Sequence, residues 1–377
     1  MMRLRAHSFM QTFVKYNPKN QKNKKPKMGI RNLQRWIRWS VPQTVQSPDW
    51  SRFSGQRIGV DILGFLYRAK ACGVYPIVYT ARMIAACKRL NITLVVVFDG
   101  KPPSEKHKIL EQRTLVRNES RIKKSQLAAT NATEFAKNEF EKLELNTTYF
   151  TSEERDQVKQ FLYSCGVLSL NASGEADNVL AYFSRKGWIS AVMSSDFDLL
   201  ARGVETLIVP DGNAVPGEPE WKQYTLSNML LHSDMNYTQF AEMCVLMGSD
   251  YTAGLRSIPF KTAYWTVKHS GSIGYTLARY NIRDTTPFAR AKQILIGVLD
   301  TEESLMNPKQ WEKWHNPHPN VEVDTLMKFA NVYFPELTYD SNIILNILLP
   351  GNTSSYSLFD YLSQNTGSLC NYTAASA

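Results

Sequence analysis

The stretch Ala191–Leu200, AVMSSDFDLL, begins as an apolar run and then stops at two aspartates, Asp196 and Asp198. We interpret the apolar residues as a buried β-strand, because short runs that end in small polar residues are typical of strands in a sheet core. Two carboxylates one residue apart repel each other. A strand that finishes in this way indicates a place where the protein uses negative charge.

Other apolar runs predict further strands of the same sheet. Residues 91–100, NITLVVVFDG, are rich in β-branched residues, which is typical of a central parallel strand, and the run ends at Asp99. Residues 56–63, QRIGVDIL, contain a shorter run that ends at Asp61. Additional strands are predicted at GVLSL (166–170) and ETLIVP (205–210). Because helical segments separate these strands, the sequence predicts an α/β fold with a central parallel or mixed sheet flanked by helices.

Length and cysteine content limit the class of protein. The 377 residues are 43% hydrophobic, so the chain can bury a full core. No apolar run reaches the roughly 18–20 residues that cross a bilayer, and we expect no membrane partner. The five cysteines are scattered and form no Cys-x-x-Cys pair, which is typical of a reduced intracellular protein.

Positive charge is concentrated in two segments of a chain whose formal net charge is +10. Residues 1–27 carry eight Lys or Arg and no acid, and residues 101–124 carry eight against three acids. Grouped basic charge suggests a polyanion as the partner. We expect residues 1–27 to be a disordered arm that acts as a nuclear localisation signal, a mitochondrial presequence or a phosphate-binding tail, or has no role. The expected location is the nucleus, with the mitochondrion or a viral replication compartment as alternatives.

Acidic residues recur where the predicted elements begin or end. The full set is Asp61, Asp99, Glu175, Asp177, Asp196, Asp198 and Asp250. A single acid at such a place is usually a helix cap or a turn former. The carboxyl ends of parallel strands converge on one edge of a sheet, so we expect these side chains to meet in one cleft. So many like charges are stable only beside cations, and oxygen ligands without His or Cys favour Mg²⁺ or Mn²⁺.

The order of these motifs resembles the flap endonuclease family of the structure-specific 5′ nuclease superfamily. The matching stretches are MGIRNLQRWI (28–37), GVDILGFLY (59–67), VVVFDGKPPSEKHKILEQR (95–113), GEADNVLAYF (174–183), SSDFDLL (194–200) and CVLMGSDY (244–251). The resemblance implies a PIN-like 5′ nuclease domain over residues 28–300. It also implies a helical arch at about 101–150 and a helix–two-turn–helix element at about 250–280. Residues 301–377 resemble nothing that indicates a role.

The resemblance further implies two Mg²⁺ ions, which Mn²⁺ could replace, and metal-assisted hydrolysis of a phosphodiester. One ion would lie among Asp61, Asp99, Glu175 and Asp177, and the other among Asp196, Asp198 and Asp250, with Asp177 shared. Lys106 and Arg113 match the catalytic lysine and its partner arginine. They lie seven residues apart, on one helical face, where cations would contact the scissile phosphate. The alternative for both is a solvated helix face.

Five further residues are assigned to nucleic-acid binding by the same resemblance: Gly29, Tyr67, Arg117, Arg121 and Lys261. Tyr67 would stack on a nucleobase, or else be a core tyrosine. Arg117 and Arg121 continue the face of Arg113 at four-residue steps. Lys261 follows the turn Ser257-Ile258-Pro259, where the family has a Gly-Ile-Gly-like turn that holds K⁺. Proline has no N–H, so the sequence leaves the K⁺ site in question.

Three functions remain open from the sequence. The first is a structure-specific nuclease that acts on 5′ flaps, gaps or 5′ ends of DNA in replication, repair or recombination. The second is an RNA-cleaving endonuclease on the same fold. The third is a catalytically inactive nucleic-acid-binding scaffold, against which the complete acidic set argues. The sequence shows no Gln-x-x-apolar-x-x-aromatic-aromatic motif, so we expect no recruitment by a sliding clamp.

Overall fold

The computed structural model describes residues 29–71, 73–128, 143, 147–210, 221–255, 258–297, 300–317 and 321–333. The predicted basic arm at residues 1–27 lies outside these ranges, as does the chain beyond residue 333. Within them, no helix combines the length and the apolar character needed to span a bilayer.

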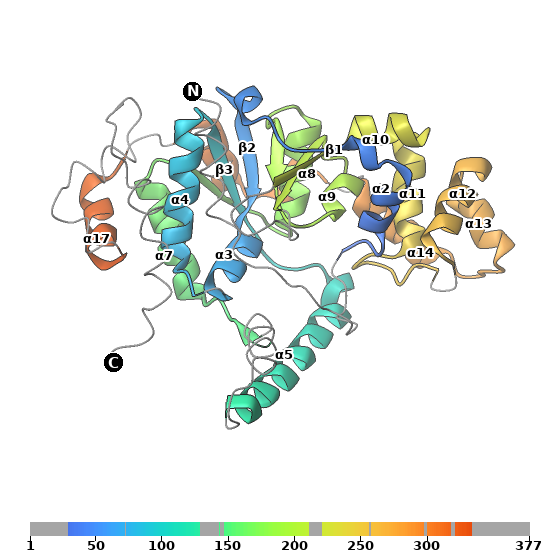
Figure 1. The fold of residues 1–377 in the computed structure, drawn as a ribbon, viewed down its shortest axis with the longest axis horizontal. Coiled ribbons are helices and arrows are strands. Elements are labelled where there is room, and N and C mark those ends of the chain that lie inside the picture. Colours follow the sequence, from blue (N-terminus) through green and yellow to red (C-terminus); the bar gives the residue numbers. More distant parts are fainter. Residues whose placement is uncertain are drawn as a thin grey trace.

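A seven-stranded mixed sheet forms the centre of the molecule (Figure 1). Its strands are β1 (Val45–Gln46), β2 (Arg57–Asp61), β3 (Thr93–Phe98), β4 (Leu168–Asn171), β5 (Ala191–Met193), β6 (Thr206–Pro210) and β7 (Trp221–Thr225). The spatial order is β1-β7-β6-β5-β2-β3-β4. The strands from β6 to β4 are parallel, whereas β7 pairs antiparallel with β6 and with β1. The predicted α/β fold with a mixed sheet is confirmed.

The antiparallel strands are the part of the sheet that the sequence analysis missed. Strand β7 reads WKQYT, in which Trp221 and Tyr224 are buried and the residues around them are half-exposed. Strand β1 has only two residues. Neither shows the continuous apolar run that marks a parallel strand covered on both faces.

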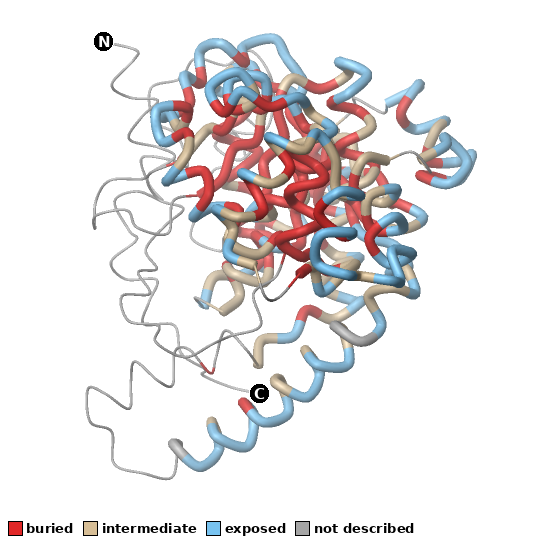
Figure 2. Tube along the Cα trace, turned by 90° about the vertical axis from the view of Figure 1, so that its right-hand side faces the viewer, coloured by how far each residue is buried: buried red, intermediate tan, exposed pale blue. Residues whose placement is uncertain are grey.

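Helices cover both faces of the sheet, and the buried residues gather between the layers (Figure 2). Helices α3 (Ile62–Ala71), α4 (Pro76–Arg89) and α7 (Ser152–Ser164) lie over one face. Helices α8 (Ala176–Arg185), α9 (Asp198–Ala201) and α11 (Tyr237–Met247) lie over the other. Strand β3 alternates between the two layers, with Val95 and Val97 in one hydrophobic cluster and Val96 and Phe98 in the other.

The remaining elements surround this core. They are α2 (Leu33–Ser40), η2 (Pro42–Thr44), η3 (Trp50–Phe53), η4 (Ser104–Lys106), α5 (His107–Ala128), α10 (Leu226–Ser233), α12 (Phe260–Ser270), α13 (Ile273–Arg279), α14 (Thr286–Leu295), α15 (Glu302–Leu305), α16 (Pro308–His315) and α17 (Val323–Tyr333). Helix α5 projects from the body and is mostly exposed (Figures 1 and 2), in the segment for which an arch is expected. Residues 129–142 and 144–146 of that segment lie outside the described ranges.

Part of the C-terminal region packs onto the sheet domain. Helix α16 contacts β4, and α17 contacts α7. Leu305 and Trp314 belong to the same hydrophobic cluster as α8 and α9. The ring of Trp314 lies 4.2 Å from that of Phe183, between centroids. The described residues after 300 therefore extend the hydrophobic core.

Helix α14 has polar links to three separate parts of the molecule. Arg290 Nε lies 2.9 Å from Glu105 Oε1, at the base of α5. Lys292 Nζ lies 2.5 Å from Oε1 of Glu242, a buried residue of α11. The carbonyl oxygen of Ile294 accepts a hydrogen bond from Arg202 Nη1 at 3.4 Å.

Candidate active site

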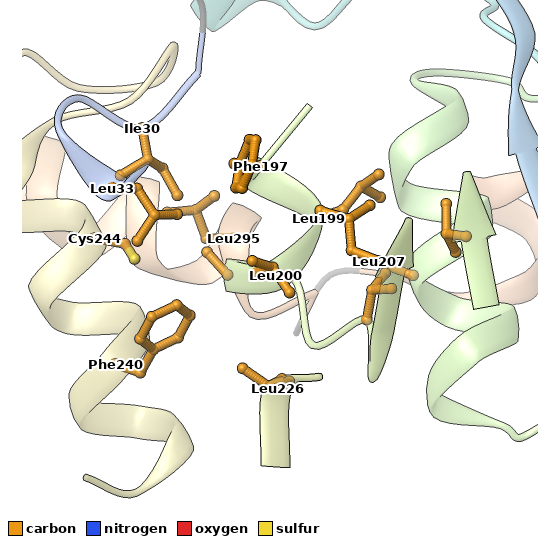
Figure 3. Packing of buried hydrophobic residues seen from close by; sticks show 14 of the residues in the cluster. Ile30, Leu33, Phe197, Leu199, Leu200, Leu207, Leu226, Phe240, Cys244 and Leu295 are labelled. Atoms are coloured by element: carbon orange, nitrogen blue, oxygen red, sulfur yellow. The ribbon is translucent and has the colours of Figure 1, made fainter. Parts of the chain in front are cut away.

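The segment that carries Asp196 and Asp198 is fixed by apolar residues that alternate with the acids. Phe197, Leu199 and Leu200 are buried; in Figure 3, Phe197 and Leu200 lie on the side of α2, α11 and α14, and Leu199 lies beside Leu207 of β6. The backbone N–H of Asp198 donates to Asp196 Oδ1 at 2.9 Å. Because the apolar side chains hold the backbone, both carboxylates are kept at the carboxyl end of β5.

Two neighbouring strands deliver Asp61 and Asp99 to the same edge of the sheet. Asp61 is the last residue of β2, which lies between β5 and β3, and it accepts a hydrogen bond from Ser194 Oγ at 3.0 Å. Asp99 follows β3 and accepts a hydrogen bond from the N–H of Ala176 at 2.8 Å. Asp99 remains exposed, and Asp61 is half-buried.

Helix N-termini position the next three acids. Glu175 precedes the first residue of α8, Asp177 lies in the first turn of that helix, and Asp198 begins α9. Carboxylates are favoured at such positions, because the partial positive charge of a helix is at its N-terminus. These short helices therefore aim negative groups at the sheet edge.

The first described residues of the chain close the cluster from the side of α11. The N–H of Gly29 donates to Asp250 Oδ1 at 3.2 Å, and the N–H of Ile30 donates to Asp198 Oδ1 at 2.6 Å. Gly29 has a φ of +73°, and a Cβ at this position would lie 2.7 Å from Asp198 Oδ1 and 2.9 Å from Asp196 Oδ1. Only glycine fits here without displacing a carboxylate. Three positions further on, Asn32 also takes a left-handed conformation, with a φ of +60°.

Crowding and burial make these carboxylates hard to ionise. Burial, followed by repulsion from Asp99, raises the pKa of Asp61 to about 7. Burial and repulsion from Asp196 raise the pKa values of Asp177 and Asp198 well above their usual range. The protein alone supplies too little positive charge for this cluster, so its donor set suits divalent cations.

Within the described residues, no three His, Cys, Asp or Glu side chains are grouped so that they could hold one metal ion as they stand. The chain's own cations already engage two of the acids. Lys106 Nζ contacts Glu175 Oε1 and lies 3.8 Å from Asp250 Oδ2. Arg113 Nη2 lies 2.9 Å from the same Asp250 oxygen. The two predicted catalytic residues thus point into the acidic cluster from η4 and α5.

Glu175 keeps its negative charge because of two nearby cations, Lys106 and Arg202. Burial disfavours the ionised form, but Lys106 and Arg202 outweigh it, and the pKa of Glu175 is lowered. The pKa of Lys106 is raised: burial opposes the charge, but Tyr251 and the carboxylates of Glu175 and Asp177 more than offset it. Lys106 Nζ also lies 5.1 Å from the centre of the Tyr251 ring.

Two residues of this site, Arg202 and Tyr251, were missed by the sequence analysis. The Tyr251 hydroxyl donates to Glu175 Oε2, and Arg202 Nη2 lies 3.1 Å from the same oxygen. Tyr251 stands inside the motif CVLMGSDY, but its contact with Glu175 joins residues 76 positions apart. Arg202, which caps the C-terminal end of α9, is an arginine within an otherwise apolar segment. That oddity was the only signal for it.

The residues expected to bind nucleic acid away from the cluster lie on separate elements. Tyr67 on α3 is half-buried, with its ring 5.9 Å from that of Phe150, as a core tyrosine would be; its stacking role stays a prediction. Arg117 is half-exposed and Arg121 exposed, both on α5. Lys261 lies in the first turn of α12, with Nζ 4.7 Å from the centre of the Trp39 ring. Ser257 in the turn before it lies outside the described residues, so the K⁺ prediction is untested.

Comparison with known proteins places two family domains over the regions that carry this site. Residues 28–120 match the model of the XPG N-terminal domain, and residues 166–250 match that of the XPG I-region. Among curated proteins, a flap endonuclease 1 of Candida albicans is 28% identical over 250 residues, which are 63% of this chain and 63% of the relative. A flap endonuclease 1 of Glycine max is 27% identical over 315 residues, 77% of this chain and 79% of the relative.

Solved structures share the fold at lower identity. The flap endonuclease-1 of Methanococcus jannaschii aligns with a TM-score of 0.53 and 19% identity, over 81% of this chain and 96% of its own. The catalytic core of Rad2 in complex with a DNA substrate aligns with a TM-score of 0.54 and 16% identity, over 85% of this chain and all of its own. Human GEN1 in complex with Holliday junction DNA gives a TM-score of 0.58 and 14% identity, over 85% of this chain and 77% of its own.

The family domains contain all seven acids of the cluster: Asp61 and Asp99 lie in the first, and the other five lie in the second. The similar sequences and the shared fold agree with these two domain matches. The chain thus contains the XPG N-terminal domain and the XPG I-region, and it is similar in sequence to flap endonuclease 1 and in fold to the solved structures of a flap endonuclease, Rad2 and GEN1.

Proposed function

We propose that this protein is a divalent-metal-dependent nuclease that hydrolyses DNA phosphodiesters at 5′ flaps, gaps or 5′ ends. One observation carries the proposal. Seven carboxylates from five places in the chain lie close enough at one sheet edge to interact electrostatically, and Lys106 and Arg113 are directed into them. The relatives named flap endonuclease support the class of substrate, and the neighbours solved with DNA support a DNA partner.

The donor set fits hard divalent ions, as judged from its chemistry and charge. All seven ligands are carboxylates, which Mg²⁺ and Mn²⁺ prefer, and the raised pKa values of Asp61, Asp177 and Asp198 indicate unmet demand for positive charge. We assign the ions to Asp61, Asp99, Glu175, Asp177, Asp196, Asp198 and Asp250. When bound, such ions activate a water for attack and neutralise the phosphate oxygens. A neighbour of the same fold, GEN1, was solved with product DNA and Mg²⁺.

The chain's own cations would act on the phosphate. Lys106 and Arg113 are held beside the cluster by Glu175 and Asp250, so they stand ready where a phosphate would enter. A phosphate oxygen offers these cations the same charge-assisted bonds that the carboxylates do. Ions bound to the carboxylates would free the side chains of Lys106 and Arg113 to bind the phosphate instead. The two cations would then stabilise the negative charge that develops as the phosphodiester is cleaved.

A cleavage panel tests this function. The purified protein would be given labelled 5′-flap DNA, gapped duplex, blunt duplex and a matched RNA hairpin, each with Mg²⁺, with Mn²⁺ or with EDTA. We expect cleavage of the flap or gapped DNA with either metal and none with EDTA. Asp198→Asn serves as the inactive control, because it keeps the shape of the side chain while removing its charge. A folded protein that cuts none of the DNA substrates, or cuts only the RNA, would contradict the proposal.

A further inference from the structure

Arg202 places a permanent positive charge beneath the acidic cluster. Its side chain is 1% exposed, and arginine keeps its proton at any physiological pH. Nη2 contacts Glu175 Oε2 and the Tyr251 hydroxyl. Nη1 contacts Asn178 Oδ1 and the carbonyl oxygen of Ile294. Each arm of the guanidinium is thus held from two sides, and the group is enclosed by α8, α14 and the segment after α11.

The contacts of Glu175 divide between its two oxygens. Oε2 is engaged by Arg202 and by the Tyr251 hydroxyl, whereas Oε1 is engaged only by Lys106 among the described contacts. The first oxygen is therefore fixed to the protein interior. The second is presented to the cluster, on the side from which Lys106 enters. A forked cation is suited to this task, because it can hold Glu175 with one arm while the other arm is anchored elsewhere.

Arg202 also differs from the other two cations in how it can move. Lys106 and Arg113 belong to η4 and to α5, the helix that projects from the body, and the side chain of Arg113 is 32% exposed. Arg202 lies in the core, and its Nε is buried without a hydrogen-bond partner among the described residues. A substrate phosphate could draw Lys106 and Arg113 away from the carboxylates. Arg202 would stay.

We propose that Arg202 is a positioning residue and fixed countercharge of this site. Its fork holds Glu175 so that Oε1 faces the bound ions, and its charge supplies part of the positive charge that the carboxylates require. The proposal rests on the metal-dependent nuclease function above. A purely structural link between α8, α9 and α14 would use the same contacts, but a folded Arg202 variant would then cleave at the wild-type rate at saturating Mg²⁺.

Two substitutions separate the fork from the charge. Arg202→Lys keeps the charge and loses the fork, and Arg202→Gln loses both. Arg185→Gln is the matched control: Arg185 Nη1 donates to the carbonyl oxygen of Arg202 at 2.6 Å and its Nη2 pairs with Asp300 at 3.1 Å, but no described contact joins it to the acidic cluster. For each variant the measurements are thermal melting, Mg²⁺ binding by calorimetry without nucleic acid, and single-turnover cleavage of 5′-flap DNA at saturating Mg²⁺.

Both Arg202 variants should cleave at least about tenfold more slowly than the wild type, the loss typical of removing a group that orients a metal ligand. The glutamine variant should bind Mg²⁺ about tenfold more tightly than the lysine variant, because it lacks one nearby positive charge. The Arg185 control should match the wild type in both measurements. Wild-type cleavage by a folded lysine variant, or equal Mg²⁺ affinity of the two variants, would overturn the proposal.

These measurements also distinguish a failure of this inference from a failure of the proposed function. If Arg202→Gln does not fold, the cleavage rate of the lysine variant still tests the role of the fork. Its Mg²⁺ affinity tests the role of the charge, and this affinity should stay within about threefold of the wild type's. A wild type that neither binds Mg²⁺ nor cleaves DNA would overturn the proposed function and this inference together. A wild type that does both, with Arg202 variants that behave like Arg185→Gln, would overturn this inference alone.

Discussion

Replacing Gly29 by alanine should damage catalysis far more than folding. The residue has a φ of +73°, a conformation that costs an alanine about 1–2 kcal/mol. The added Cβ would lie 2.7 Å from Asp198 Oδ1 and 2.9 Å from Asp196 Oδ1, closer than non-bonded atoms approach. Either the two carboxylates or the backbone at Gly29 must therefore shift.

The size of the effect follows from the bonds that such a shift would break. The N–H groups of Gly29 and Ile30 donate to Asp250 and Asp198, and hydrogen bonds to charged groups contribute about 1.5–3 kcal/mol each. Losing one of these hydrogen bonds, or displacing one carboxylate at a similar cost, would remove about 2–3 kcal/mol of transition-state stabilisation. Since about 1.4 kcal/mol corresponds to a factor of ten, single-turnover cleavage should fall about 30- to 100-fold.

Gly187→Ala is the matched control for this experiment. Gly187 has a φ of +68°, and a Cβ there would meet nothing within 4 Å. That variant should lose about 1–2 kcal/mol of stability and keep its cleavage rate. The assay is single-turnover cleavage of a 5′-flap DNA in Mg²⁺, with thermal melts to confirm folding. If the Gly29 variant cleaves as fast as the Gly187 variant, the contact between the chain start and the acidic cluster has no part in catalysis.

Three further outcomes are expected. Asp198→Asn should abolish Mg²⁺-dependent cleavage. It should also raise the melting temperature in EDTA at neutral pH, because it removes a carboxyl group whose ionisation is opposed by burial and by Asp196; a lower melting temperature in EDTA would contradict this. Lys106→Ala should slow single-turnover cleavage at least about 100-fold without changing the Mg²⁺ concentration at half-saturation. Lys101→Ala, at an exposed residue nearby, should change neither quantity. A wild-type rate for Lys106→Ala would reject its role at the phosphate. Finally, the pKa of Asp61 is about 7 in the folded protein against 3.8 for the free side chain, so the folded state retains the proton and metal-free stability falls as pH rises from about 4 to 7. Addition of Mg²⁺ should therefore raise the melting temperature more at pH 7.5 than at pH 5.5, and an equal rise at both values would argue against ion binding at these carboxylates.

The parallel strands and the sheet-edge acids were predictable because each leaves a local mark in the sequence. The run NITLVVVFDG became β3 (Thr93–Phe98), buried on both faces, with Asp99 directly after it. The apolar run that stops at Asp196 and Asp198 marked the strand that became β5 (Ala191–Met193), with both acids following it. In both cases a few neighbouring residues decide the local structure.

Pairing across the chain was not predictable in the same way. Arg202 and Glu175 are 27 residues apart, and Tyr251 is a further 49 residues from Arg202, so no local pattern joins them. Strand β7 was missed because its polar residues resemble a loop until β6 supplies hydrogen-bond partners. The ion pairs of Lys106 and Arg113 with the acids also depend on how η4 and α5 pack against the sheet, which a single sequence does not reveal.

The three links of α14 set a fixed spacing within the molecule. Arg290, which binds Glu105 beside Lys106, and Ile294, which accepts from Arg202, are four residues apart, or about 6 Å along a helix. Lys292, between them, joins the buried Glu242 of α11. Helix α14 thus sets the distances between the start of α5, Arg202 and α11. Inserting or deleting a single residue between these attachment points would rotate them relative to one another by about 100°, so a change of length would disturb the three links together.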